Sequence, residues 1–516
     1  MTDHFSRRAS ACRSPAAWSR RTVATAMALG LGFTAPSPAA DSRAASTPPR
    51  VQHVLLISID GLHASDLQRY VRTHPRSALA ALSAHGETFT QARTPAPADS
   101  FPGLLALVTG GTPAATGVYY DVTYDRALSP PGSDCKQLGT VVRYDESIDL
   151  PAAPHDVDRI DPARLPRDPR HGCAPVWPHQ FLRVNTVFDV AHDAGLYTAW
   201  ADKHPAYDIV QGPAGHGVAD LDTPEIGDNF RGKADAEADK ITASIERTAA
   251  YDRMKAQAVL NEIDGLSHDG RHAAPVPALF GMNVQAVSVG QKRGGYLDAD
   301  GRPSPALARA LDDSDSLIGD LIRELDRRHL RDSTLVVVTA KHGNAPVDSA
   351  RLRHIPRHEL LEAVRAAAGQ APAQLTADDI ALVWFAPAPP RPLQSIIDRL
   401  NRQSAVLGIA RVETGSQFSG AAADSRTPDL VLIPRPGVIY AHSGDDKRAE
   451  HGGISDDDRH VAMLLSNPVL FPQPRQAALR VSTTQLAPTM LDMLGLNPRA
   501  LRAVRQQSVP ELPDLR

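Results

Sequence analysis

The segment Val54–Leu62, with the sequence VLLISIDGL, constrains the fold of this chain more than any other feature. Apolar residues that favour strands run directly into Asp60, which is followed at once by Gly61. A buried parallel strand presents a polar residue at the carboxyl edge of its sheet in this way. The segment therefore predicts a central strand of an α/β fold that places Asp60 at a functional edge. A turn former or a helix cap is the alternative role for this carboxylate.

Segments typical of strands alternate with helical patterns from Arg50 onward, which predicts a doubly wound, mostly parallel α/β sheet. Leu and Ile gather on one face of the predicted helix Ser304–Leu325, so we expect it to pack on the sheet. The expected strands are 53–59, 196–201, 278–280 leading into 284–289, 334–339 and 429–434. The expected helices are 102–109, 187–194, 304–325 and 484–494.

Two long stretches interrupt this alternation. Residues 119–184 are rich in Pro, Asp and Arg, and residues 345–425 carry a helix-strand-helix pattern of their own. Long loops of this kind commonly carry function. We interpret both as insertions at one edge of the sheet, where they would form a cap over the substrate.

The first forty residues have the pattern of a secretory signal peptide. Basic residues precede the apolar run Val23–Phe33, and small residues follow up to Ala39 and Ala40. The apolar run is too short to cross a bilayer. Ser19-Arg20-Arg21 resembles a twin-arginine export signal, which leaves the general secretory and twin-arginine routes open. We expect residues 41–516 to be exported to the periplasm or secreted, with no transmembrane segment in the mature protein.

Net charge and cysteine content exclude some classes of partner and of metal site. The leader carries five Arg and one Asp, so its removal would change the formal charge from −4 to −8. A mildly acidic protein is a poor partner for a nucleic-acid polymer. Cys135 and Cys173 remain after cleavage, and an oxidising compartment favours a disulfide between them. No CxxC motif or Cys/His cluster indicates a structural zinc site.

Ser100 is the candidate nucleophile. It lies in Asp99-Ser100-Phe101-Pro102-Gly103, where a helix is expected to begin. The free amides and the dipole of a helix N-terminus attract anions, so its hydroxyl would face a phosphate pocket. An ordinary N-cap serine is the alternative. The chain lacks a Gly-x-Ser-x-Gly elbow, which favours activation of the hydroxyl by a cation.

Two histidines beside glycines are candidate metal ligands. His342 in Lys341-His342-Gly343 follows the apolar strand predicted over Leu335–Thr339, and His451 lies in Glu450-His451-Gly452-Gly453. A neutral imidazole binds divalent metals, and the glycines let the loop turn closely around an ion. A surface turn is the alternative interpretation of His342.

A further polar segment follows the strand predicted over Leu196–Ala201. It contains Asp202, His204 and Asp208 within seven residues at the same predicted edge of the sheet. These side chains are candidates for contact with a metal or with the substrate. A plain polar loop explains the segment equally well.

Taken in order, these motifs resemble the alkaline phosphatase superfamily. The branch that they resemble most is that of the type I phosphodiesterases and nucleotide pyrophosphatases, and the resemblance covers most of residues 50–498 apart from the two insertions. The segments that carry it are Ile59-Asp60-Gly61, Ser100–Gly103 with Leu107–Gly110, Thr112–Gly117, His342-Gly343, His451-Gly452, and Thr484–Leu491 with Leu494-Gly495.

The resemblance implies a fold and a set of roles. The fold is a three-layer α/β/α sandwich with a mostly parallel central sheet, here a hydrolase domain over residues 41–516 with cap insertions near 119–184 and 345–425. Two zinc ions assist a Ser or Thr that accepts the phosphoryl group. Asp60, Ser100 and His342 would ligate one metal, with Ser100 as nucleophile, and His451 would ligate the other.

The chain departs from the family pattern at several metal ligands. Ala340-Lys341-His342-Gly343 replaces Ser-Asp-His-Gly, and only Asn283 and Gln285 stand where the family has an Asp and a following His. An ammonium group repels a nearby cation by about 4 kcal/mol at an intermediate dielectric. Three explanations remain open. Lys341 replaces one metal, a single ion remains and recruits Asp202, His204 or Asp208, or the site binds anions without catalysis.

We therefore expect an exported phosphodiesterase or phosphatase that acts on a small organic phosphate ester. Ser100 would act with zinc or another divalent metal, one or two ions, with Lys341, or with both. Asn283 and Gln285 are additional candidate contacts. An inactive relative that binds an anionic ligand or partner is the alternative. A sulfatase is less favoured because Gly103 and Leu104 follow Pro102, whereas sulfatases have an Arg in this context.

Overall fold

The computed structural model describes residues 50–150, 159–227, 241–419, 424–442 and 444–515. The chain divides into residues 1–45 and residues 46–516, and every described residue belongs to the second unit. The predicted signal peptide over residues 1–40 lies outside the described residues. Among the helices that the structure describes, none combines the length and the apolar character needed to cross a membrane.

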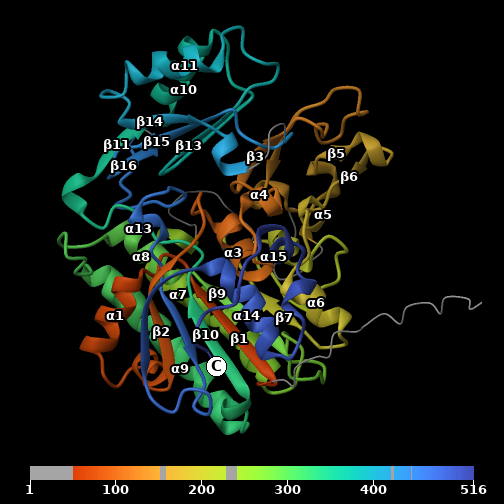
Figure 1. Cartoon of the computed structure of the whole chain (residues 1–516), viewed down its shortest axis with the longest axis vertical. Helices are drawn as coiled ribbons and strands as arrows, with labels where there is room; N and C mark the ends of the chain where they lie inside the picture. The colour runs from red at the N-terminus through yellow and green to blue at the C-terminus, as the bar shows by residue number, and fades with distance from the viewer. Residues whose placement is uncertain (1–49, 151–158, 228–240, 420–423, 443, 516) are drawn as a thin grey trace, which may run out of the picture. The chain divides into compact units, whose positions relative to one another are not determined.

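A central sheet organises the described chain (Figure 1). Its strands follow the order β18-β2-β17-β10-β1-β9-β7-β8, and β17 alone runs antiparallel to its neighbours. The bounds are β1 (His53–Ile59), β2 (Gly86–Arg93), β7 (Ala199–Ala201), β8 (Asp220–Asp222), β9 (Leu279–Val284), β10 (Thr334–Thr339), β17 (Met463–Ser466) and β18 (Arg475–Ser482).

The central strands are apolar because both faces of the sheet are covered. Along β1, Val54 and Leu56 belong to one core cluster, and Leu55 and Ile57 belong to another. A parallel sheet buried on both faces gives such continuous apolar strands. The strands predicted at 53–59 and 334–339 have the same bounds in the structure. The predicted α/β class with a mostly parallel sheet is confirmed.

Helices cover both faces of the sheet and complete the three layers. The helices that share the core cluster of Val54 include α3 (Ser100–Thr109), α6 (Val187–Asp193) and α14 (Leu486–Met493). The helices on the other face are α1 (Ala64–Thr73), α2 (Ala78–Ala84), α7 (Ile245–Ile263), α8 (Ala286–Gly294) and α9 (Pro305–Arg327).

One predicted strand is wrong. Residues 284–289 do not continue as a strand, because β9 ends at Val284 and α8 begins at Ala286. A short apolar segment fits a buried strand and a buried helix equally well. Asp252 of α7 decides between them, since its carboxylate accepts the backbone N–H groups of Gln285 and Ala286 at 2.8–3.0 Å.

The strand predicted at 429–434 is β15 (Leu430–Pro434), but it belongs to a second, smaller sheet of order β12-β13-β15-β14. This sheet and its helices have a separate core cluster. The elements are β11 (Arg353–Pro356), α10 (Arg357–Ala368), β12 (Gln374–Ala377), β13 (Ala381–Trp384), α11 (Leu393–Asn401), β14 (Ile409–Thr414), α12 (Ser416–Ser419) and β16 (Val438–Ala441).

Residues of the two predicted insertions contact each other. Tyr119 and Tyr120 belong to one apolar cluster with Leu382 and Trp384 of β13. A disulfide joins Cys135 and Cys173. The remaining short elements are α4 (Pro113–Thr116), β3 (Val122–Asp125), β4 (Thr140–Arg143), β5 (Arg167–Asp168), β6 (Ala174–Pro175), α5 (Pro178–Phe181), α13 (Asp456–Arg459) and α15 (Arg502–Gln507).

Candidate active site

Four neighbouring strands deliver the candidate residues to one edge of the central sheet. β10, β1, β9 and β7 lie side by side and run in the same direction, so their carboxyl ends meet. Ligands bind outside such ends in open α/β sheets. The polar residues that follow or close these strands are Lys341 and His342, Asp60, Asn283 and Gln285, and Asp202 and Lys203.

Asp60 lies at the centre of this group and is 1% exposed. Its Oδ1 accepts from Asn283 Nδ2 at 2.8 Å, and its Oδ2 accepts from Gln285 Nε2 at 2.5 Å. The ammonium groups of Lys203 and Lys341 lie 3.3 and 3.4 Å from Oδ2. Burial alone would raise the pKa of Asp60, but these two cations hold it well below its usual range. Asp60 is therefore ionised.

Ser100 begins α3, and its hydroxyl lies between two side chains of this group. Lys203 Nζ donates to Ser100 Oγ at 3.2 Å, and His342 Nε2 lies 3.3 Å from the same oxygen. Asp99 is the N-cap and accepts the N–H of Phe101 at 3.2 Å. The hydroxyl thus faces a positive charge, an imidazole nitrogen and the positive end of the helix dipole.

Glycines allow this close arrangement. A Cβ on Gly103 would lie 2.3 Å from the carbonyl oxygen of Lys341, so only glycine lets α3 lie directly against the end of β10. Gly61, after Asp60, has a φ of +84° and would place a Cβ 2.1 Å from Gln291 Oε1.

His342 is a neutral imidazole that faces Ser100. Its Nδ1 lies 2.9 Å from the carbonyl oxygen of Gly343, which can only accept, so Nδ1 carries the hydrogen and Nε2 offers a lone pair to Ser100. Burial, together with the neighbouring His451, lowers the pKa of His342 well below its usual value. The two rings stack with centroids 3.9 Å apart.

His451 connects this group to a second set of charges. Its Nδ1 lies 3.0 Å from Glu450 Oε2, and its Nε2 lies 3.7 Å from Asp99 Oδ1. Burial and the charge of Lys292 lower the pKa of His451 to about 4. Glu450 in turn forms ion pairs with Lys292 at 2.7 Å and Lys447 at 2.6 Å.

Lys341 is completely buried beneath this group. Its Nζ donates to Tyr207 OH at 3.0 Å and lies 3.8 Å from Asp202 Oδ1. Asp202 also accepts from Trp200 Nε1 at 3.0 Å. Lys341 is thus held between two carboxylates and a phenol, a position that compensates buried negative charge.

The structure brings most of the predicted site residues together. Asp208 lies apart, because its carboxylate contacts the His179 ring at 2.6 Å. His204 belongs to a neighbouring group described below. Sequence reasoning missed Lys203 as a site residue, although it directly follows Asp202 at a strand end. The residues that meet are Asp60, Ser100, Asp202, Asn283, Gln285, Lys341, His342 and His451.

The residues around Asp60 do not fit the two-zinc site that the resemblance implies. Zinc needs free lone pairs from carboxylates, imidazoles or thiolates. Here the Asp60 oxygens accept from amides, and Lys203 and Lys341 approach within 3.4 Å. Like unit charges about 4 Å apart repel by about 4 kcal/mol at an intermediate dielectric. A divalent ion would face two such ammonium groups.

A cavity of about 260 Å³ opens beside this group. Lys203 and Gln285, which contact Asp60, contribute to its wall. Lys292, Arg293 and Lys447 add three further cations, and Asp446 and Glu146 contribute carboxylates. The four cations favour an anionic ligand in this cavity, and Lys203 connects it to Ser100 through the contact at 3.2 Å.

Comparisons with known proteins agree with this architecture. The family model for type I phosphodiesterase / nucleotide pyrophosphatase matches residues 54–456. The solved structure of murine ectonucleotide pyrophosphatase / phosphodiesterase 5 (ENPP5) is similar, with 15% identity, a TM-score of 0.55, and coverage of 87% of this chain and 96% of the other.

Two related structures give the same result. Human ENPP5 has 15% identity and a TM-score of 0.56 over 86% of this chain and 96% of the other. An inactive variant of murine ENPP5 in complex with AMP has 15% identity and a TM-score of 0.55, with 87% and 96% coverage. At this identity the likeness concerns the fold. No curated protein sequence matches the chain.

Proposed function

This chain belongs to the type I phosphodiesterase / nucleotide pyrophosphatase family and is a phosphoric ester hydrolase; on that premise, we propose that Ser100 is its nucleophile and that lysine ammonium groups replace the family's zinc ions. One observation carries the proposal. Lys203 Nζ contacts both Ser100 Oγ and Asp60 Oδ2, at 3.2 and 3.3 Å. The ammonium group thus places positive charge beside both oxygens, which is the charge that a divalent metal would supply there.

The chemistry assigned to Lys203 is electrostatic. A positive charge beside a serine hydroxyl lowers the pKa of the hydroxyl and stabilises the alkoxide that attacks phosphorus. Phosphoryl transfer needs little more from the protein than positioning and neutralisation of the phosphoryl oxygens. Asp60 holds Lys203 in place, and buried Lys341 keeps Asp60 from neutralising it completely.

His342 is the proposed proton acceptor. Its Nε2 takes the proton of Ser100 as the bond from Oγ to phosphorus forms and the bond from phosphorus to the ester oxygen breaks. The proton then passes to the departing oxygen. A water molecule next attacks the phosphoserine. His342 takes the proton of the water as the bond from the water oxygen to phosphorus forms and the bond from phosphorus to Ser100 Oγ breaks, and it returns that proton to Oγ as inorganic phosphate or the phosphomonoester leaves.

The proposed substrate is a small organic phosphate ester of the nucleotide type. Four cations in the cavity wall suit an anionic substrate: Lys203, Lys292, Arg293 and Lys447. The solved complex of the ENPP5 variant contains AMP, which supports a nucleotide-like ligand for this fold. We further propose that the signal peptide over residues 1–40 exports the enzyme to the periplasm or the medium.

The test compares wild type with Ser100→Ala on bis-p-nitrophenyl phosphate and on p-nitrophenyl phosphate. We expect kcat to fall by about 10³-fold or more, as for loss of other nucleophiles. Ser83→Ala is the matched control, since Ser83 lies in α2 and donates only to Leu79 O. Equal rates for wild type and Ser100→Ala would remove Ser100 from the mechanism.

The missing metal ligands favour one alternative, an inactive relative that binds anions. That protein would bind inorganic phosphate in the same cavity without hydrolysing either ester. Calorimetric titration with phosphate, made in parallel with the assay, separates the two functions. A sulfate ester in the same assay tests the less favoured sulfatase.

A further inference from the structure

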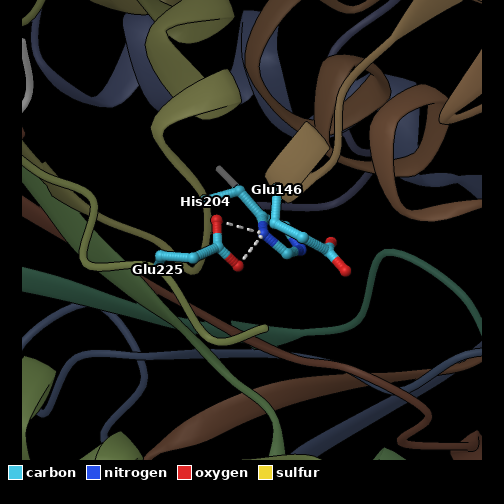
Figure 2. A group of neighbouring side chains, drawn as sticks. All are labelled: Glu146, His204 and Glu225. Carbon is cyan, nitrogen blue, oxygen red and sulfur yellow. Dashed lines mark hydrogen bonds and ion pairs between the residues drawn. The ribbon is translucent and has the colours of Figure 1, made fainter. Parts of the chain in front are cut away.

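Glu146, His204 and Glu225 meet beside the candidate active site and come from three separate segments (Figure 2). Glu146 begins the 3-10 helix η1 (Glu146–Ile148), His204 caps η5 (Pro205–Gln211), and Glu225 follows β8. One ligand atom from each side chain lies within 4.8 Å of the other two. His204 Nδ1 is 2.7 and 2.9 Å from the two carboxylate oxygens of Glu225.

A fourth side chain faces this cluster independently. Asp149 is 5% exposed, and neither of its carboxylate oxygens has a hydrogen-bond partner among the described residues. Glu225 and His204 lie close enough to act on its carboxyl group. A buried carboxyl group without a partner is costly, which favours an additional ligand at the position of Asp149.

The imidazole of His204 lies directly against Glu225, with Nδ1 facing both carboxylate oxygens. Imidazole nitrogens and carboxylate oxygens are the ligands that divalent transition metals take in proteins. An imidazole beside the carboxyl groups of Glu146, Asp149 and Glu225 is therefore a set of ligands that suits such a cation.

We propose that Glu146, Asp149, His204 and Glu225 bind one divalent first-row transition-metal ion of the Mn²⁺ or Zn²⁺ type. The imidazole favours such ions over Ca²⁺ and Mg²⁺, and the carboxylates suit Mn²⁺ and Zn²⁺. Glu146 is exposed, which gives an ion a path from the solvent. This proposal does not depend on the proposed function, because it concerns binding and a different set of side chains.

The position of this site gives it a role next to the nucleophile. Glu146 and His204 line the same cavity as Lys203. His204 directly follows Lys203, whose ammonium contacts Ser100 at 3.2 Å. An ion bound to His204 therefore fixes the loop that positions Lys203, without touching Asp60 or Ser100.

The test is titration of the chelator-treated full-length protein with MnCl₂ by calorimetry, followed by electron paramagnetic resonance. We expect one ion per chain in wild type and an affinity at least about tenfold lower in Glu225→Gln and in Asp149→Asn. His342→Gln and His451→Gln are matched controls at the positions of the family's zinc ligands, and they should bind Mn²⁺ as wild type does. The resonance signal should show coupling to one nitrogen, which His204→Gln abolishes.

Three results would overturn the proposal. The first is that wild type binds neither Mn²⁺ nor Zn²⁺. The second is that Glu225→Gln and Glu146→Gln keep full affinity for the ion. The third is that His342→Gln loses this affinity while Glu225→Gln keeps it. Thermal melting shows whether each variant is folded. If Glu225→Gln does not fold, Glu146→Gln decides, because Glu146 is exposed and its substitution does not alter the core.

Discussion

Two regions on either side of the loop after β7 differ in how their buried carboxyl groups are compensated. Around Asp60, one buried carboxylate has two ammonium groups within 3.4 Å and two amide donors. Around Glu225, the carboxyl groups of Glu146, Asp149 and Glu225 share one imidazole. Buried charge needs a partner. The first region has its cations in the chain, and the second needs one from solution.

Adjacent residues connect these regions. The backbone at His204 is extended, with φ −140° and ψ 143°. Successive side chains of an extended segment point to opposite sides. Lys203 therefore contacts Asp60 and Ser100, while His204 contacts Glu225. A change on one side of the loop should affect the other side through the backbone and through the charge of Lys203 next to His204.

Lys341→Met gives the largest expected effect, because it removes a fully buried cation from between Asp60 and Asp202. Removal of one partner of a buried ion pair costs about 3–5 kcal/mol. Urea unfolding should show this loss in the free energy of unfolding. An unchanged midpoint would contradict the view that Lys341 compensates these carboxylates.

Lys203→Met should lower kcat by about 10²–10³-fold, the range seen when one donor to a developing charge is removed. KM should change less, because Lys292, Arg293 and Lys447 remain in the cavity wall. Lys136→Met, at an exposed lysine paired with Asp134, is the control. A kcat close to that of wild type would mean that Lys203 does not replace a metal.

Asp99→Asn tests the pH dependence of the first region. Burial raises the pKa of Asp99 to about 7. The folded protein therefore holds this proton more tightly than the unfolded chain, so the stability from Asp99 is complete below about pH 4 and is lost as the pH rises through about 7. Asn keeps the N-cap. The fall in melting temperature between pH 5 and pH 8 should be smaller in the variant, and an equal fall would refute this assignment.

Asp149→Asn should give the smallest effect. In chelator-treated protein, burial and the carboxylate of Glu225 raise the pKa of Asp149 to about 9, so the group is protonated near pH 7. Asn then replaces one neutral side chain by another of the same shape, and the melting temperature should change by less than about 1–2 °C. With Mn²⁺ present, the variant should instead be stabilised less than wild type. A lower melting temperature without metal would show that Asp149 stabilises the metal-free fold.

Local patterns predicted the parts of the molecule that depend on short stretches of sequence. β1 and β10 are apolar over their whole length, and the expected bounds are the observed ones. The strand predicted over residues 284–289 was wrong because the segment fits both a strand and a helix. Hydrogen bonds to Asp252 of α7 favour the helix α8. Among the side chains around Asp60, the sequence predicted those that directly follow a strand, such as Lys341 and His342 after β10.

The sequence by itself determined the α/β fold, the strand end that carries Asp60, and the family, and it predicted that the family's zinc ligands are incomplete. Only the tertiary structure showed which cations surround Asp60. Lys203 is 143 residues from Asp60 and reaches it because parallel strands gather their carboxyl ends at one edge. The sequence offered His204 as a candidate ligand but gave no local signal for Glu146 or Glu225, because their meeting depends on distances between side chains that only the folded backbone sets.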